Sequence, residues 1–169
     1  IVYDAADPAT KPLIGHVFAH EAAGAGGTAA LAAEAGERLV ALGYHAQVVP
    51  APGHVSMFHL DGGRQPIGFD DGRFVVGGRA VDRTTLSERA SANPAAFSPN
   101  VLLRPIVQDA LFPTIAYVAG PSELAYLGQL KAVYADFGVP MPLMYPRASA
   151  TLLDSAGVRF LAKHNVALE

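Results

Sequence analysis

Three polar side chains recur at a four-residue spacing inside the most apolar part of the sequence. Asn100, Arg104 and Gln108 occupy positions i, i+4 and i+8 of the run NVLLRPIVQDAL. On a helix this spacing places them on one face, while apolar residues cover most of the remaining surface. Such a helix is buried, and a buried guanidinium without a partner is costly. The stripe must therefore face buried partners, a water-filled cleft or an anionic ligand.

Three interpretations of this stripe stay open on the sequence, and one of them is that the stripe is a fully solvated face of the helix. In the first, Arg104 pairs with Asp109 or Glu123, and the polar network serves only to fix how the helices pack. In the second, the stripe faces a ligand, and Arg104 neutralises a carboxylate or a phosphate. Asp109 and Glu123 then become candidates for holding an ammonium group or for acting as a general base.

A second group of polar residues follows a predicted buried strand at 114–118. Gly120 and Pro121 turn this strand into the start of a helix, with Glu123 near its third position and Tyr126 on the same face. Free N–H groups at a helix start favour anions, and ligands bind beyond the carboxyl ends of parallel strands. Glu123 is also placed to cap its own helix. Ligand contact and capping therefore both stay open for this residue.

The next predicted strand, at 141–145, is followed by the segment YPRAS. Arg147 and Ser149 lie in this segment. Parallel pairing of the two strands would bring these residues to the same sheet edge as Gly120. The sequence thus predicts that separate polar motifs converge at this edge.

The elements that must position these residues are helices and short strands, with Gly and Pro at their ends and Ser, Thr or Asp at helix starts. A buried strand is predicted at Ile1–Tyr3. Helices are predicted at about 9–22, at 28–42 with Thr28 as N-cap and Gly43 past its end, from Thr84 or Thr85 to Asn93, at 99–111 with Ser98 as N-cap, at 121–137, and from Asp154 or Ser155 onward.

The predicted strands, together with the predicted helices, indicate an α/β fold. Asp-Gly pairs separate short runs rich in β-branched and aromatic residues, so a small antiparallel meander is expected at 46–81. Strand 114–118, helix 121–137 and strand 141–145 form a predicted right-handed, parallel, Rossmann-like βαβ unit.

One globular domain of a longer protein is expected. Its core consists of the strand and helices of 1–45 and the βαβ segment 98–169, and the meander with its connecting helix is inserted at 46–97.

Composition excludes several classes of function. The absence of cysteine excludes disulfides, thiolate metal sites and a cysteine nucleophile in these 169 residues. A net charge of −3 without a long run of either sign makes nucleic acid an unexpected partner. The absence of cysteine also fits a reducing cytosol, so a cytoplasmic protein is expected. No apolar run reaches the roughly 18 residues of a membrane span, so no membrane contact is expected. His16 and His20 have zinc-ligand spacing but no evident third ligand, and no metal site is predicted.

The run from Asn100 to Ser149, with the order of elements before it, resembles the central portion of the cysteine ligases of bacillithiol biosynthesis. Over 98–151 the polar residues, prolines and glycines match together, as in VAGPSELAY and YPRAS. The sequence opens with IVYDAADP and closes with a Leu-Glu pair. An internal piece of a longer enzyme is therefore expected.

The resemblance implies a Rossmann-type enzyme with inserted segments and a long coiled coil that supports a homodimer. It implies that cysteine is added to glucosaminyl malate by amide formation, and it leaves open whether ATP or another adenine nucleotide is a cofactor. The alternative is a non-catalytic α/β binding or structural module of a larger protein. Asp109 and Glu123 are the catalytic candidates, and the substrate-binding candidates are Asn100, Arg104, Gln108, Gly120, Tyr126, Arg147 and Ser149.

Overall fold

The computed structural model describes residues 4–5 and 7–167. The predicted strand at Ile1–Tyr3 lies outside these residues. In chain order the elements are η1 (Lys11–Ile14), α1 (Gly15–Gly24), α2 (Gly27–Ala41), β1 (His54–Leu60), β2 (Arg64–Asp70), β3 (Arg73–Val76), β4 (Arg79–Val81), α3 (Arg83–Ala92), η2 (Pro94–Ala96), β5 (Phe97–Pro99), α4 (Arg104–Leu111), β6 (Ala116–Ala119), α5 (Pro121–Leu127), α6 (Lys131–Asp136), β7 (Leu143–Pro146) and α7 (Ser155–His164).

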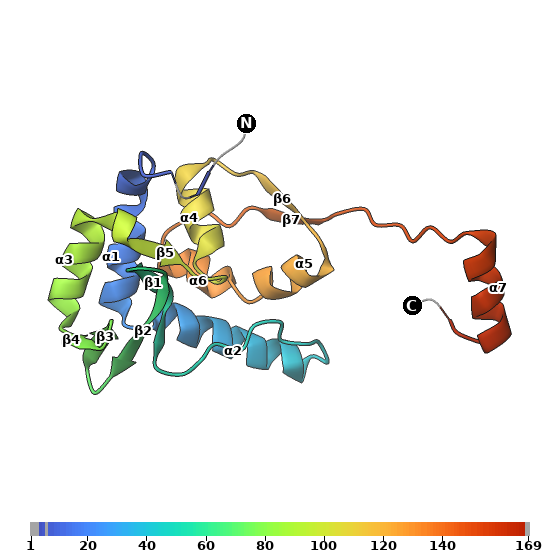
Figure 1. Ribbon diagram of the computed structural model, residues 1–169, viewed down its shortest axis with the longest axis horizontal. Coiled ribbons are helices and arrows are strands. Elements are labelled where there is room, and N and C mark those ends of the chain that lie inside the picture. The colour runs from blue at the N-terminus through green and yellow to red at the C-terminus, as the bar shows by residue number, and fades with distance from the viewer. Residues whose placement is uncertain (1–3, 6, 168–169) are drawn as a thin grey trace.

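Two separate sheets organise the chain (Figure 1). The larger sheet has five strands in the order β4-β3-β2-β1-β5, and the smaller is the pair β6-β7. Helix α1 packs against α3 and β1, while α2 contacts β1 and α6, so α2 runs between the two sheet regions. Phe18, Met57, Ile67, Leu103 and Tyr134 are buried in one apolar cluster that both regions share.

The antiparallel meander is confirmed, although it begins at His54 and not near residue 46. Two-residue turns join its later strands. Asp71 and Gly72 have φ of 45° and 76°, and the Gly77-Gly78 turn also has positive φ. Positive φ at both central residues matches the twist of the flanking strands, which explains why Asp-Gly marked the hairpin in the sequence.

The predicted helix start at Ser98 is wrong. Ser98 lies in β5, which pairs antiparallel with β1, and α4 begins only at Arg104. Asn100 is the residue that ends the extended segment, because its Oδ1 accepts the N–H groups of Leu102 and Leu103 at 2.9 and 3.1 Å. An Asn side chain can satisfy the free N–H groups of a helical turn as well as Ser can. Asn100 therefore precedes α4, and only Arg104 and Gln108 of the predicted stripe lie on that helix.

The smaller sheet is a parallel pair. Ala116 to Ala119 of β6 align with Leu143 to Pro146 of β7, and α5 and α6 lie between the two strands in the chain. One helix at 121–137 was expected, but the chain turns at 128–130 between two short helices. The right-handed Rossmann-like βαβ unit stays a prediction, because the larger sheet of the described residues is antiparallel.

Helix ends follow the sequence signals only in part. The Thr28 cap is wrong, since α2 is preceded by Gly26, and the Thr84 or Thr85 cap is wrong, since Asp82 accepts the Thr85 N–H. The end of α2 is confirmed, and Gly43 lies just past it with φ of 86°. The start of α7 at Asp154 is also confirmed, because its side chain accepts the Gly157 N–H.

Two buried polar side chains tie the elements together. Gln129 is fully buried, and its Oε1 accepts the Val48 N–H at 3.0 Å. Its Nε2 donates to the carbonyl oxygens of Ala32 at 3.1 Å and Val48 at 2.8 Å. A Cβ on Gly36 would lie 2.9 Å from this Nε2, so glycine leaves the space for the amide. Gln129 therefore joins the turn between α5 and α6 to α2 and to the segment before β1.

Glu21 of α1 is the second buried connection. Its Oε1 accepts the Ser56 N–H of β1 at 2.6 Å, and its Oε2 accepts the Thr28 hydroxyl of α2. Burial raises the pKa of the Glu21 carboxyl, while the bonds from Thr28 and Ser56 oppose that rise. The predicted capping residue Thr28 thus serves to hold α2 against α1 and β1.

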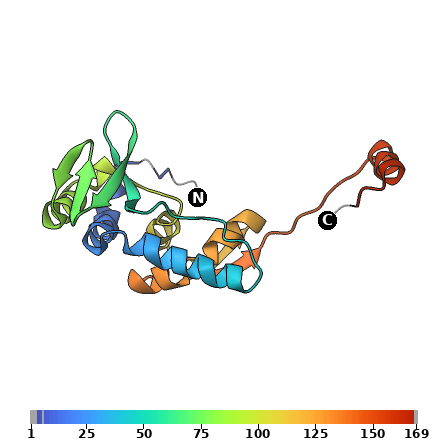
Figure 2. The ribbon, with the colours of Figure 1, turned by 90° about the horizontal axis from the view of Figure 1, so that it is seen from below.

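The end of the described chain stands apart from the rest. An extended segment at 147–154 leads from β7 to α7, which lies clear of the other elements in both views (Figures 1 and 2). None of the described residues of α7 is buried. Within the described residues, every helix is too short or too polar to cross a bilayer.

Replacing Gln129 with Ala is expected to lower the free energy of unfolding by about 2–4 kcal/mol, because buried backbone groups of Ala32 and Val48 lose their partners. Gln108→Ala is the control, since Gln108 donates one bond of 3.3 Å to Asp109. Its effect is expected to stay within about 1 kcal/mol. Urea unfolding measures both values. Equal small losses for the two variants would contradict the structural role of Gln129.

Glu21 is expected to make stability fall as pH rises. Because its pKa in the folded chain is raised above the ordinary value of 4.5, the native state keeps this proton to a higher pH than the unfolded state. The free energy of unfolding therefore decreases as pH rises from 4.5 toward the native pKa. Glu21→Gln lacks this decrease. Denaturant unfolding of both proteins from about pH 4 to about pH 8 checks the prediction, and parallel curves would refute it.

Candidate functional site

At the carboxyl ends of β6 and β7, Glu123 joins the start of α5 to the end of β7. Its Oε2 accepts the Gly120 N–H at 2.9 Å and an N–H of Arg147 at 3.5 Å. Gly120 is the N-cap of α5, Pro121 begins the helix and Glu123 stands at its third position. Glu123 therefore caps α5, which is one of the two roles that the sequence left open, and it also pairs with the cation that follows β7.

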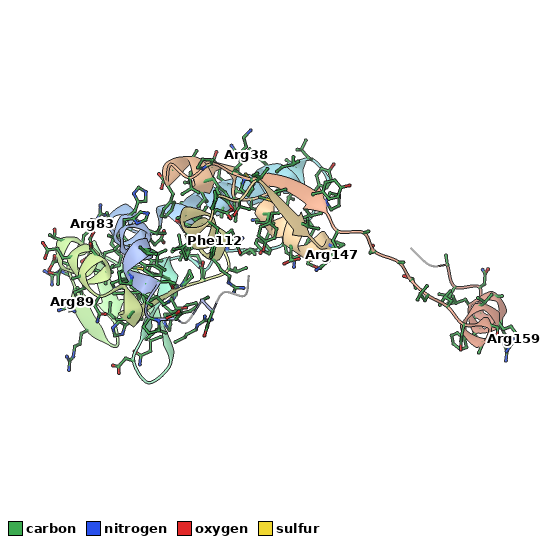
Figure 3. The ribbon with its side chains drawn as sticks, turned by 90° about the horizontal axis from the view of Figure 1, so that it is seen from above. Arg38, Arg83, Arg89, Phe112, Arg147 and Arg159 are labelled. Atoms are coloured by element: carbon green, nitrogen blue, oxygen red, sulfur yellow. The ribbon has the colours of Figure 1, made fainter. Side chains whose placement is uncertain are left out.

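The ion pair at this edge is open to solvent. The side chains of Arg147 and Glu123 are 63% and 39% exposed. Figure 3 shows Arg147 where the chain leaves β7 for the extended segment. A Cβ on Gly120 would lie 2.5 Å from Nη2 of Arg147, so a side chain there would displace the guanidinium. An exposed pair contributes at most about 1 kcal/mol to stability, so a ligand can replace either partner at little cost.

Tyr134 is buried and belongs to a hydrogen-bonded group with Asp109 and Gln108. The hydroxyl of Tyr134 donates to Oδ2 of Asp109 at 2.5 Å, and Nε2 of Gln108 donates to Oδ1 at 3.3 Å. Burial, followed by the bond to Asp109, raises the pKa of Tyr134 well above its ordinary range. Asp109 thus has a strong donor on one oxygen and a weaker donor on the other.

Tyr126 lies close enough to Glu123 and to Arg104 for both charges to shift its pKa. Burial, together with the neighbouring Tyr117, raises its pKa to about 12. The negative charge of Glu123 adds to the rise, and the positive charge of Arg104 opposes it. Tyr126 is therefore neutral at physiological pH and lies within the electrostatic reach of both residues. Its hydroxyl can donate a hydrogen bond without losing its proton.

Arg104 also lines a cleft that the sequence analysis did not identify. This cavity has a volume of about 560 Å³, and its polar lining consists of Asp4, Lys11, Arg64, Ser98 and Arg104. Neither Glu123 nor Arg147 lines it. The cleft and the edge of the parallel pair are thus two separate places, and the charge of Arg104, which lines the cleft, also acts on Tyr126.

The cations that line the cleft lie on different elements of the fold. Lys11 of η1 is only 6% exposed, and its Nζ donates to the Phe97 carbonyl at 3.4 Å. Arg64 of β2 donates to Oγ of Ser98 at 3.0 Å. Burial, and then the charge of Arg64, lowers the pKa of Lys11. These residues are far apart in the sequence, so no spacing pattern could have indicated them.

The remaining candidates lie in more ordinary surroundings. Asn100 caps the turn before α4, and Ser149 is exposed in the extended segment after β7. His20 does not pair with His16 but contacts Asp136 at 2.9 Å and packs on Phe137. Within the described part of the chain, no group of three or more acidic and histidine side chains is arranged to hold a metal ion.

Comparison with known proteins gives one family. The family described as "Bacillithiol biosynthesis BshC, N-terminal Rossmann-like domain" matches residues 1–148. Three similar proteins carry the name "Putative cysteine ligase BshC". The relative from Koribacter versatilis is 35% identical over 100% of this chain, that from Geobacillus thermodenitrificans is 38% identical over 90%, and that from Salinibacter ruber is 43% identical over 78%.

This chain spans only a part of each relative. The matched regions cover 32%, 29% and 24% of the three proteins, in the same order. The matched region contains both the Gly120–Glu123–Arg147 edge and the cleft around Arg104.

Replacing Tyr134 with Phe is expected to lower the free energy of unfolding by about 1.5–3 kcal/mol, because the hydroxyl donates to a carboxylate. Tyr145→Phe is the matched control, since Tyr145 is 59% exposed on β7. Its effect is expected to stay within about 0.5 kcal/mol. Thermal and denaturant unfolding give both values. A Tyr134→Phe protein as stable as the control would show that Asp109 does not depend on this bond.

Proposed function

Because the chain belongs to the family of the BshC N-terminal Rossmann-like domain of bacillithiol biosynthesis, we propose that it supplies part of the active site of a cysteine ligase. The proposed reaction adds cysteine to glucosaminyl malate by amide formation. An amide forms when a free amine attacks an activated carboxyl, and the amine must lose a proton during the reaction. The site therefore needs groups that hold anions, a group that holds or deprotonates an amine, and donors that fix the orientation of the substrate.

The single observation that carries the proposal is the exposed Glu123–Arg147 pair beyond the ends of two parallel strands. This is where ligands bind in open parallel sheets. Arg147 can bind a substrate carboxylate or phosphate through its planar fork. Glu123 can hold an ammonium group or take its proton, because the bonds from Gly120 and Arg147 both end on Oε2 and leave Oε1 available. Opposite charges side by side suit a substrate that carries both an amine and an anionic group.

The other candidates have narrower proposed roles. Arg104 is proposed to bind an anionic part of the substrate, and Tyr126 to donate a hydrogen bond from its neutral hydroxyl. Asp109, with Gln108 beside it, is proposed to assist proton transfer through Tyr134. The Gly120 N–H, Asn100 and Ser149 are proposed to bind substrate at the rim. The proposed substrates are cysteine and glucosaminyl malate, and the proposed assembly is a homodimer.

A second candidate function is a non-catalytic binding or structural module. It is favoured by the number of predicted site residues that already have structural partners. Glu123 caps α5, Asn100 caps the turn before α4, and Asp109 accepts the Tyr134 hydroxyl. In this alternative the polar residues order the packing, and the rest of a larger protein carries the chemistry.

Arg147→Lys in the full-length protein separates the two functions. Lys keeps the charge but loses the planar fork, so kcat/KM for ligation is expected to fall about 10- to 150-fold, while Tm is unchanged. Arg159→Lys is the control, because Arg159 lies on the detached helix α7 (Figure 3). The rate of product formation from cysteine and glucosaminyl malate, measured by mass spectrometry, gives the activity. Loss of several degrees of Tm with normal turnover per folded molecule would favour the structural alternative.

A further inference from the structure

The cleft that Arg104 lines is more positively charged than the chain as a whole. Three cations, Lys11, Arg64 and Arg104, line it, against one carboxylate, that of Asp4. The whole chain has a net charge of −3. Positive charge has therefore been concentrated in one cavity of an acidic protein, which is the arrangement that attracts and holds an anion.

The cations of the cleft keep unused hydrogen-bond donors. Arg64 uses one described bond, to Ser98, out of the five donors of a guanidinium. Lys11 uses one long bond of 3.4 Å, to a carbonyl. Within residues 4–5 and 7–167, no ion pair joins Lys11, Arg64 or Arg104 to a carboxylate. Burial, and then repulsion from Arg64, lowers the pKa of Lys11, and a bound anion would relieve that repulsion.

The three cations of the cleft come from three different elements. Lys11 lies in η1, Arg64 in β2 and Arg104 in α4, and the fold brings them to one cavity. Phosphate sites commonly use the free N–H groups at a helix start. Before α4 these groups are taken, because Asn100 accepts the N–H groups of Leu102 and Leu103. The cleft therefore offers side-chain cations instead of a backbone cradle.

We infer that the Lys11–Arg64–Arg104 cleft binds a dicarboxylate, with Arg64 and Arg104 each taking one carboxylate and Lys11 supporting them. A volume of about 560 Å³ leaves space for a sugar attached to that group. This inference rests on the proposed function, in which the acceptor carries the two carboxylates of malate. The acceptor would then bind by its malyl group in the cleft and extend past Arg104 toward Glu123.

Binding of malate to the full-length protein tests the inference without requiring activity. Isothermal titration is expected to show that malate binds more tightly than lactate, which is the same 2-hydroxy acid without the second carboxylate. Inorganic phosphate is the third probe. Arg64→Gln and Arg104→Gln are each expected to weaken malate binding about 10- to 150-fold. Arg38→Gln is expected to leave it unchanged, because Arg38 does not line the cleft.

Three results would overturn the assignment. Equal affinity for malate and lactate would remove the second carboxylate contact, and tighter binding of phosphate than malate would indicate a phosphate site. Malate binding that survives both glutamine variants would place the ligand elsewhere. If Arg64→Gln unfolds, Arg64→Lys keeps the charge and is expected to give an intermediate loss of affinity with an unchanged Tm. A protein that binds malate through these arginines but shows no ligation would retain the inference and refute the proposed function.

Discussion

The buried amide of Gln129 is the contact on which the arrangement of the candidate site depends. Gln129 lies in the turn between α5 and α6. Its side chain forms hydrogen bonds with α2 and with the segment before β1. Gly36 leaves the space for it. Because α5 carries Glu123 and Tyr126, and α6 carries Tyr134, the position of one uncharged side chain fixes where three candidate functional groups stand relative to the apolar core. A buried polar group with all its bonds made is specific in direction, which apolar contacts are not.

The charged candidate groups lie at two separate places. Glu123 and Arg147 meet at the end of the parallel strands, while Lys11, Arg64 and Arg104 surround a cleft beside β5 and α4. The charges of Glu123, at the edge, and of Arg104, in the cleft, shift the pKa of Tyr126 in opposite directions. A substrate with an amine at one end and carboxylates at the other would fit such a separation of charge. This arrangement is the basis of our proposal that the substrate carries both kinds of group.

The sequence correctly predicted structural features that depend mainly on residues close together in the chain. Asp71-Gly72 marked a hairpin, Gly43 marked the end of α2, and the segments that lead to Gly120 and Arg147 pointed to one sheet edge. It failed where tertiary contacts overrode local signals. Ser98-Pro99 reads as a helix start, but pairing with β1 holds it extended, and Thr28 reads as a cap, but its hydroxyl bonds to Glu21. The cleft could not be predicted, because Lys11, Arg64 and Arg104 have no sequence spacing that relates them.

The central claim is that one substrate spans the cleft and the edge of the parallel pair. A crystal structure of the full-length protein with bound glucosaminyl malate tests it most directly. The account predicts the two malyl carboxylates within hydrogen-bond distance of Arg64 and Arg104, and the amine of the sugar directed toward Glu123. A ligand bound with its carboxylates on other residues, and with the Lys11–Arg64–Arg104 cleft filled only by solvent, would contradict the account.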